Sequence, residues 1–153
     1  MANLDDIDRR LLAELQDQGR ITNVQLAQRV GLTAPPCLRR VRALEEDGVI
    51  RGYHADIDPS RMGYSITVFA MVSLKSQAEE ALREFEEAMR ELPEVREVHM
   101  LNGEIDFIIK IVARDLQAFQ EFLTSKLTPA PNVDSVKTSL TIRTSKQEPG
   151  VPL

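Results

Sequence analysis

Three closely spaced arginines in a predicted helix are the residues whose chemistry is easiest to interpret. Arg39, Arg40 and Arg42 fall within the sequence GLTAPPCLRRVRALEEDGVI, residues 31–50. Between positions 33 and 44 the chain carries these three positive charges and no negative one. A guanidinium group offers a fork of donors that matches both phosphate oxygens and the O6/N7 edge of guanine. The stretch therefore suits a groove lined with phosphates, while the alternative is a solvated face that only pairs with nearby carboxylates.

The helix that carries these arginines has predictable ends. Thr33 is a predicted N-cap whose hydroxyl can accept from the free N–H groups of the first turn. Pro35 and Pro36 fall in that turn, where a missing N–H costs little. Gly48 is predicted to end the helix in the left-handed conformation. At about 100° per residue, the arginines lie away from a buried face made of Cys37, Val41 and Leu44.

Two shorter predicted helices precede this one and complete a recognisable unit. Leucine and isoleucine at spacings of three and four predict a helix over residues 5–18. Thr22 and Gln25 form a capping-box pattern that begins a short helix ending at Gly31. This order is that of a helix-turn-helix, whose last helix lies in the major groove of DNA. A small three-helix unit can also be only structural or dock a protein, but the arginine face favours DNA.

The overall charge opposes nucleic-acid binding and the local charge supports it. The 153 residues carry a formal net charge of −5 and a sequence pI near 5.1. Phosphate contacts require local cation density. Acidic residues collect at Asp5, Asp6 and Asp8 and along residues 79–91. The arginine helix can therefore attract DNA although the average charge does not.

The composition limits the class of protein to a globular one with one ordinary domain or two small ones. Hydrophobic residues make up 42% of the chain and charged residues 28%, which excludes a disordered chain. No apolar run approaches the roughly 20 residues that span a bilayer, and MANLDDIDRR does not resemble a signal peptide. We expect a cytoplasmic protein without membrane association. The single cysteine, Cys37, excludes an intramolecular disulfide and is expected in the core.

The second half of the chain alternates predicted strands and helices. The segment VIRGYHADID is predicted to be a connector strand. The elements predicted after it are a strand over 64–75, a helix over 77–92, strands over 95–101 and 106–113, a helix capped by Asp115, and a strand over 136–144. This order is the ferredoxin-like βαββαβ plan, with both helices on one face of an antiparallel sheet. The other face is predicted to hold Phe69, Met71 and Met100 as an apolar dimer interface.

The turn LNGEIDF between the two middle strands suits a small zwitterionic ligand. Asn102 and Gly103 favour positive φ, which would turn their backbone N–H groups outward together. Glu104 and Asp106 place carboxylates beside them. An amino acid needs donors for its carboxylate and an acid for its ammonium group. The alternative interpretation is a hairpin turn that binds nothing.

Residues 4–63 resemble a known family almost residue for residue. The run LDDIDRRLLAELQDQGRITNVQLAQRVGLTAPPCLRRVRALEEDGVIRGYHADIDPSRMG is similar, without a gap, to the DNA-binding half of the Lrp/AsnC (feast/famine) transcriptional regulators. The resemblance implies that the third helix enters the major groove of double-stranded DNA. The residues then expected at DNA are Thr22, Asn23, Thr33, Ala34, Pro35, Pro36, Arg39, Arg40 and Arg42.

The second half resembles the effector-binding and oligomerisation domain of the same family. The resemblance implies an amino-acid site between dimers, to which a Gly-x-x-Asp pattern matching Gly103 and Asp106 contributes. The expected effector residues are Met100, Leu101, Asn102, Gly103, Glu104, Asp106, Leu116 and Thr141. It further implies that connector strands pair between subunits and that homodimers assemble to octamers.

The predicted fold is therefore α+β, with an N-terminal winged-type helix-turn-helix, a connector strand and a C-terminal ferredoxin-like βαββαβ domain. The predicted boundaries are 1–50 for the DNA-binding domain, 51–63 for the connector strand and linker, 64–145 for the effector-binding and oligomerisation domain, and 146–153 for a mobile tail. The predicted function is sequence-specific transcriptional regulation in response to a small effector, with an amino acid favoured.

Two other functions compete with this prediction. An enzyme would need a base or nucleophile in a closed pocket, yet His54 and His99 fall in different predicted domains and no Ser/His/Asp or Cys/His set is present. We accordingly predict no catalytic residue, no metal ligand and no cofactor. The other rival is an effector-sensing or protein-interaction module without DNA activity, which a test with the protein's own upstream DNA would separate.

Overall fold

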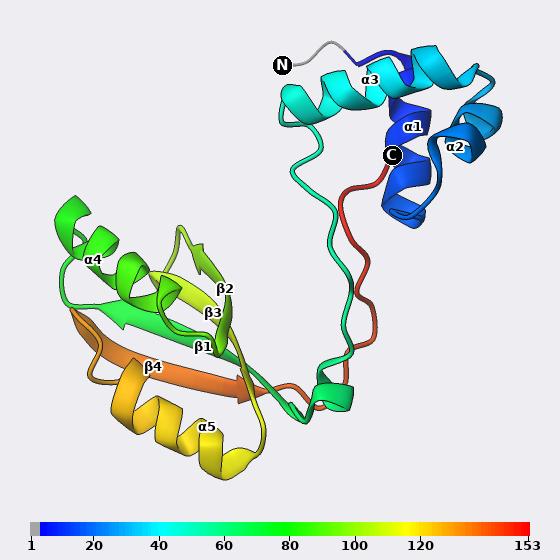
Figure 1. Cartoon of the computed structure of the whole chain (residues 1–153). Helices are drawn as coiled ribbons and strands as arrows, with labels where there is room; N and C mark the ends of the chain where they lie inside the picture. Colours follow the sequence, from blue (N-terminus) through cyan, green and yellow to red (C-terminus); the bar gives the residue numbers. More distant parts are fainter. Residues whose placement is uncertain (1–3) are drawn as a thin grey trace. The chain divides into compact units, whose positions relative to one another are not determined.

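The computed structural model describes residues 4–153 and divides them into two compact units (Figure 1). The first, the helical unit, comprises the N-terminal residues through Asp56 together with Lys146–Leu153. The second, the sheet unit, comprises Ile57–Ser145. The chain therefore passes from one unit to the other twice.

The helical unit contains α1 (Asp6–Asp17), α2 (Asn23–Val30) and α3 (Ala34–Glu46). The α1 helix begins with a capping box between Asp5 and Asp8, and α2 begins with the predicted box between Thr22 and Gln25. Gly31, at φ 75°, ends α2 in the left-handed conformation. The three helices bury one apolar core that includes Leu11, Leu26, Ala27, Val30, Cys37 and Val41. These helices and the buried position of Cys37 confirm the predictions.

The start of α3 differs from the prediction in one detail. Thr33 is the N-cap, but its hydroxyl makes no capping hydrogen bond. A capping side chain accepts from the N–H of the second or third helical residue. Pro35 and Pro36 occupy these two positions, and proline has no N–H. The prolines therefore remove the donors that the predicted cap would have used.

The connector after α3 is not a strand in the single chain, so the expected strand pairing between subunits stays a prediction. Residues 51–58 have no regular secondary structure and are exposed. A strand requires a hydrogen-bonded neighbour, and the described part of one chain supplies none here. A short 3-10 helix, η1 (Pro59–Met62), follows the connector, with the Asp58 side chain accepting from the Ser60 N–H.

The sheet unit follows the predicted βαββαβ order. Its elements are β1 (Ile66–Leu74), α4 (Glu79–Arg90), β2 (Val95–Met100), β3 (Phe107–Ala113), α5 (Leu116–Phe122), the π-helical η2 (Leu123–Leu127) and β4 (Val133–Leu140). The strands lie in the order β2-β3-β1-β4, and every neighbouring pair is antiparallel (Figure 1). This arrangement confirms the predicted ferredoxin-like architecture.

Both helices cover the same face of the sheet. Alternate residues of β1 and β3 are buried, and they share one core with residues of α4, α5 and η2. The rings of Phe85 on α4 and Phe107 on β3 have their centroids 4.9 Å apart. The buried members of this core are Val68, Ala70, Val72, Leu74, Leu82, Phe85, Met89, Phe107, Ile109, Ile111, Phe122, Leu127 and Val133.

The opposite face, which we call the open face, has no helix of the sheet unit over it. Phe69 and Met71 of β1 lie there with Ile108 and Val112 of β3, and all four are half-buried. Met100 was predicted on this face, but it pairs with the buried Phe107 and so lies on the helix side. An irregularity between Val95 and Glu97 shifts the register of β2, and one residue of shift exchanges the two faces.

The last strand lies earlier than predicted, at Val133–Leu140 instead of 136–144. An irregularity next to Leu74 lets Val133 pair with that residue and enter the core. At the other end, Thr141 donates to the carbonyl of Thr67, close to where β1 begins. Alternation in the sequence continues to Thr144, but β4 stops when its partner strand does.

Residues 146–153, predicted to be a mobile tail, belong by their contacts to the helical unit. The side-chain amide of Gln16 on α1 donates to the carbonyl of Val151 at 2.8 Å and accepts its N–H at 3.0 Å. Gly150 has φ 72°, and a Cβ at this position would overlap the Gln16 side chain. A glycine is therefore required for this contact.

Candidate functional site

The three arginines of α3 have different surroundings. The guanidinium of Arg40 is half-buried, and its Nη1 lies 2.7 Å from Asp5 Oδ2 and 2.8 Å from Asp8 Oδ1. Arg39 and Arg42 are exposed, and among residues 4–153 neither has a carboxylate within ion-pair distance. Two of the three predicted cations are therefore available to an external anion, and the third is already paired.

The paired arginine changes the ionisation of its neighbours as well as its own. Its hydrogen bonds to Asp8 and Asp5 raise the pKa of Arg40. The pKa of Asp5 is lowered, first by the backbone N–H of Asp8 and then by Arg40. Both shifts favour the charged forms of Arg40 and Asp5.

Thr22 and Asn23, both predicted at DNA, hold the helices in place. The Thr22 hydroxyl accepts from the Gln25 N–H at the start of α2. The Asn23 side chain donates through Nδ2 to the carbonyl of Ala34 at 2.8 Å, which ties α2 to the first residue of α3. Asn23 Oδ1 is buried and has no hydrogen-bond partner within the described part of the chain.

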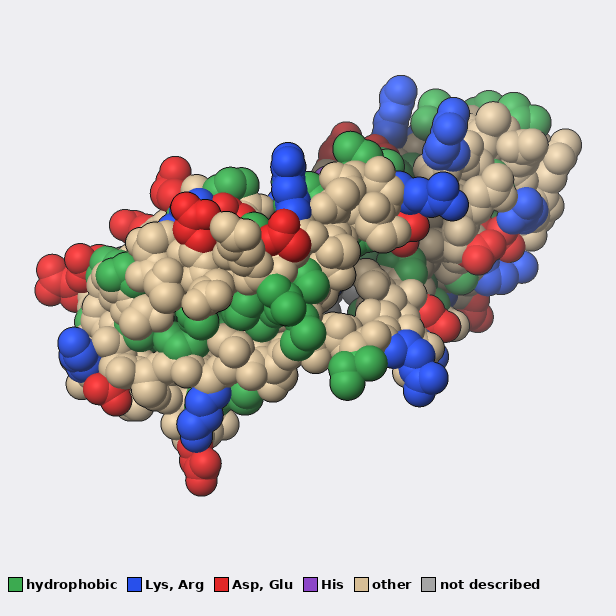
Figure 2. Space-filling view, turned by 90° about the horizontal axis from the view of Figure 1, so that it is seen from below, with side chains coloured by type: hydrophobic (Ala, Val, Ile, Leu, Met, Phe, Trp, Pro, Cys, Tyr) green, Lys and Arg blue, Asp and Glu red, His purple; other side chains and the backbone are tan. Residues whose placement is uncertain are grey.

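The tip of α3 carries no charged side chain. Thr33 and Pro35 are exposed there, while Ala34 and Pro36 are half-buried. In the view of Figure 2, Lys and Arg side chains project singly between acidic ones and do not merge into one broad basic surface. The positive charge that α3 offers to DNA is that of the exposed Arg39 and Arg42, which lie further along the helix.

The loop between β2 and β3 closes differently from the predicted turn. Leu101 donates to the carbonyl of Asp106 at 2.8 Å, so the reversal is spread over the residues between them. Neither Asn102 nor Gly103 has positive φ. The predicted left-handed Asn-Gly conformation is therefore wrong, because only a tight two-residue hairpin requires it.

Asp106 ties this loop to the end of β1. Its Oδ2 accepts the N–H of Leu74 at 2.7 Å, and its Oδ1 accepts from the Gln77 side chain at 2.9 Å. Its own N–H donates to the carbonyl of Val72 at 3.0 Å. Glu104 is exposed beside it. The carboxylate that sequence analysis assigned to a ligand therefore also has a structural role.

The eight predicted effector residues do not form one pocket in a single chain. Met100, Leu101, Asn102, Gly103, Glu104 and Asp106 lie where β2 passes into β3. Leu116 begins α5 after the far end of β3, and Thr141 bonds to Thr67, which pairs with Val112 at that far end. At about 3.4 Å per residue, β3 separates the two groups by roughly 20 Å. A site that used both groups would need a second chain.

Comparison with known proteins agrees with both halves of this description. Residues 4–51 match a winged helix-turn-helix DNA-binding family, and residues 67–151 match the Lrp/AsnC ligand binding domain. The chain is 54% identical over 143 residues to a leucine-responsive regulatory protein of Rhizobium meliloti, covering 94% of this chain and 92% of that protein. The chain belongs to the Lrp/AsnC family. Across the full length of both chains it is also 40% identical to the Bkd operon transcriptional regulator of Pseudomonas aeruginosa.

Solved structures of Lrp/AsnC proteins share its fold throughout. The transcriptional regulator NMB0573 of Neisseria meningitidis, solved in complex with L-Met, has a TM-score of 0.93 and 33% identity over 98% of this chain and 97% of its own. An AsnC family regulator from Agrobacterium tumefaciens has a TM-score of 0.91 and 32% identity over 97% of each chain. The predictions of a DNA-binding transcriptional regulator and of its family are thus confirmed.

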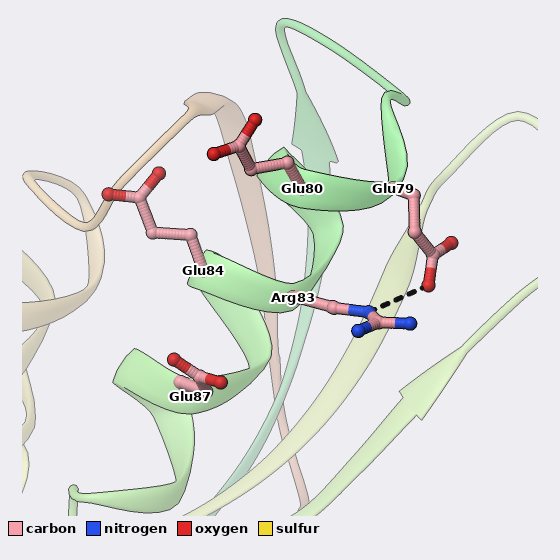
Figure 3. Close-up of a pocket in the computed structure, with 5 residues that line it drawn as sticks. All are labelled: Glu79, Glu80, Arg83, Glu84 and Glu87. Carbon is pink, nitrogen blue, oxygen red and sulfur yellow. Dashed lines mark hydrogen bonds and ion pairs between the residues drawn. The ribbon is translucent and has the colours of Figure 1, made fainter.

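A shallow hollow on α4 of this Lrp/AsnC protein is lined by Arg83 and four glutamates (Figure 3). Arg83 lies 2.9 Å from Glu79, while Glu80, Glu84 and Glu87 have no such partner in the hollow. Four carboxylates would repel the carboxylate of an amino acid. The hollow is therefore a solvated acidic surface, separate from the predicted effector loop.

Tyr53 is a residue of the helical unit that sequence analysis passed over. Its hydroxyl donates to Glu45 on α3 at 2.9 Å, and burial followed by the effect of Glu45 raises the pKa of Tyr53 to about 12. It also lines a small hollow with Leu15, Leu26 and Leu38. The signal that could have found it is the single tyrosine in the connector RGYHADID.

Residues 4–153 form neither a metal-ligand cluster nor a membrane-spanning helix. Among residues 4–153, no group of three or more His, Cys, Asp or Glu side chains is placed to hold a metal ion. Over the same residues, no helix has the length and apolar character needed to cross a membrane.

Proposed function

We propose that this regulator binds double-stranded operator DNA as a homodimer through α3, and that an amino acid alters its assembly or its DNA affinity. The observation that carries the proposal is the likeness to NMB0573, a regulator complexed with L-Met whose structure matches over almost the whole chain. We place this activity in the cytoplasm, together with the DNA that it controls.

The DNA-binding part of the proposal rests on the exposed side of α3. Arg39 and Arg42 extend from the helix away from its buried residues and carry unpaired positive charge within the described chain. Exposed Thr33 and Pro35 form a tip without side-chain charge, which can approach base edges closely. These residues are the proposed contacts, with phosphate binding supplying most of the affinity.

The dimer is proposed to form through the open face of the sheet. Phe69 and Met71 lie beside Ile108 and Val112, and a second sheet would bury all four. Lys110 lies between Ile108 and Val112 on this face, opposite Phe69, and bonds Glu97 at 2.8 Å. Isologous contact between two such faces would give a twofold dimer that presents two α3 helices. Assembly of dimers to octamers is part of the same proposal.

The effector is proposed to bind where two chains meet. One chain would contribute Glu104, Asp106 and their loop, and a second would contribute the other end of its sheet near Leu116 and Thr141. Exposed Met100 and Leu116 suit an apolar side chain. Leucine and methionine are therefore the first candidates, consistent with the names of the relatives.

The test is a titration of the full-length protein with DNA from its own upstream region. DNA binding is measured by fluorescence anisotropy and assembly by sedimentation velocity, each with and without each of the twenty amino acids. We expect a specific DNA complex in all cases and a shift of assembly or affinity with an apolar amino acid. A protein that binds no upstream DNA, or one indifferent to all twenty amino acids, would contradict the corresponding half of the proposal.

A further inference from the structure

We infer that Arg40 is a positioning residue, which fixes α3 against the start of α1 and makes no contact with DNA itself. The inference rests on the proposed function of α3 as the DNA-reading helix. It gives Arg40 a different role from Arg39 and Arg42, although all three lie on one stretch of helix and each carries a positive charge.

The contacts of Arg40 use oxygens that the α1 capping box leaves free. In the box, Asp5 Oδ1 accepts the Asp8 N–H at 2.8 Å, and Asp8 Oδ2 accepts the Asp5 N–H at 3.1 Å. The remaining oxygens, Asp5 Oδ2 and Asp8 Oδ1, both accept from Arg40 Nη1. All four carboxylate oxygens therefore have a donor, and one guanidinium nitrogen joins the two acids.

The burial of these side chains and their separation in sequence indicate that the network holds α1 and α3 together. The Asp8 side chain is only 14% exposed and that of Arg40 34% exposed. The partners are 32 and 35 residues apart, so the contact exists only when α1 and α3 are packed together. Charge-assisted hydrogen bonds in a partly desolvated network constrain geometry more than an isolated surface pair does.

The network also reduces electrostatic repulsion between the two carboxylates at the start of α1. Asp5 and Asp8 are two carboxylates one helical turn apart, and they would repel both each other and a nearby DNA backbone. Arg40 places a positive charge between them. Together with the Asn23 bond to the Ala34 carbonyl, it holds α3 at both its beginning and its middle.

The sharpest test uses a substitution for which a positioning role and simple electrostatics predict opposite changes in DNA affinity. Asp8→Asn removes a negative charge from the helical unit, which by itself should strengthen attraction to DNA. If Arg40 positions α3, the loss of its less exposed partner should instead weaken binding of upstream DNA roughly fivefold. The matched control is Asp6→Asn, an exposed neighbour without an ion pair in the described chain, which should leave affinity unchanged or raise it.

A second measurement counts phosphate contacts through the salt dependence of binding. Loss of one phosphate contact lowers the slope of log K against log salt by about 0.9. Arg39→Ala or Arg42→Ala should lower the slope, whereas Arg40→Ala should reduce affinity and thermal stability with the slope unchanged. Circular dichroism of each full-length variant establishes that it is folded.

The outcomes separate this inference from the proposed function. A lowered slope in Arg40→Ala, or an Asp8→Asn protein that binds DNA as tightly as Asp6→Asn does, would overturn the positioning role. Unchanged DNA binding in both Arg39→Ala and Arg42→Ala would instead overturn the assignment of α3 as the DNA-reading helix. In that case the thermal stability of Arg40→Ala still decides whether Arg40 fixes α3 against the start of α1.

Discussion

The helical unit and the sheet unit differ in how their proposed sites are assembled. In the helical unit, the proposed DNA contacts lie along one helix, α3, within a dozen consecutive residues. In the sheet unit, the proposed effector residues fall into two groups at opposite ends of β3. A site on one helix can be complete in a single chain, whereas the second arrangement requires another chain to complete it. The proposed DNA contacts therefore belong to the surface of one chain, and the proposed effector site belongs to an assembly of chains.

Removal of Arg39 and Arg42, the two exposed arginines of α3, should have the largest effect, and it should change DNA binding alone. The Arg39→Ala/Arg42→Ala double variant should bind upstream DNA roughly a hundredfold more weakly, with the salt slope lowered by about 1.8 for each α3 helix on the DNA. Assembly and the amino-acid response should be unchanged, since both belong to the sheet unit. Anisotropy over a salt series gives the affinities and slopes. The control is Arg83→Ala/Arg90→Ala on α4, which removes the same charge elsewhere and should bind DNA normally.

Asp106→Ala should show that the effector loop has a structural as well as a binding role. The substitution leaves the Leu74 N–H and the Gln77 amide without their acceptor, which should lower the free energy of unfolding by about 1–3 kcal/mol. Urea unfolding measures this loss, and sedimentation measures the amino-acid response, which should disappear. Glu104→Ala, at an exposed neighbour, should retain full stability. If Asp106→Ala is as stable as Glu104→Ala, the anchoring role of Asp106 is refuted.

Gly150→Ala should release the C-terminal tail from α1 with a smaller loss. An alanine there would strain the backbone at φ 72° and overlap Gln16, so the bonds between Gln16 and Val151 should break. Stability should fall by about 1 kcal/mol. Limited proteolysis should cut residues 146–153 faster in this variant than in Gln28→Ala, which alters an exposed glutamine on α2. Equal cleavage rates would mean that the tail contact contributes nothing.

Acid should weaken each unit through a separate ion network, which is the smallest expected effect. The pKa of Asp5 lies below its ordinary value of 3.8, and Lys110 with His99 holds the pKa of Glu97 below 4.5. Because both values are depressed in the folded state, their stabilisation is present above the unfolded values and is lost as pH falls through the folded ones. Hydrogen exchange between pH 6 and about 3 should therefore show less acid sensitivity of the helical unit in Asp5→Asn and of the sheet unit in Glu97→Gln. A variant that weakens the other unit instead would contradict this separation.

The sequence predicted most of the fold because most of its signals are local. Hydrophobic spacing placed the helices and strands, and Thr22, Gly31 and Asp115 marked ends that the structure confirms. The differences from the structure occurred where a distant partner decides the result. Residues 51–58 are not a strand without a neighbour, Met100 changed face through a register shift, and β4 ends where β1 begins. The candidate site residues stay predictions, and the partners of their side chains, such as Asp8 for Arg40, lie too far away in sequence to be predicted.

The sequence alone determined that α3 is a helix with one buried and one cationic side, because 3.6-residue periodicity and prolines in the first turn act over a few residues. Only the tertiary structure decided the partners of three polar side chains. Arg40 bonds Asp8 of α1, Asn23 bonds the carbonyl of Ala34, and Asp106 accepts the N–H of Leu74 at the end of β1. Arg40 and Asp106 each meet a partner 32 residues away in sequence. A polar side chain's role is set by the opposite charge or donor nearest in space, and chain folding brings that partner into place.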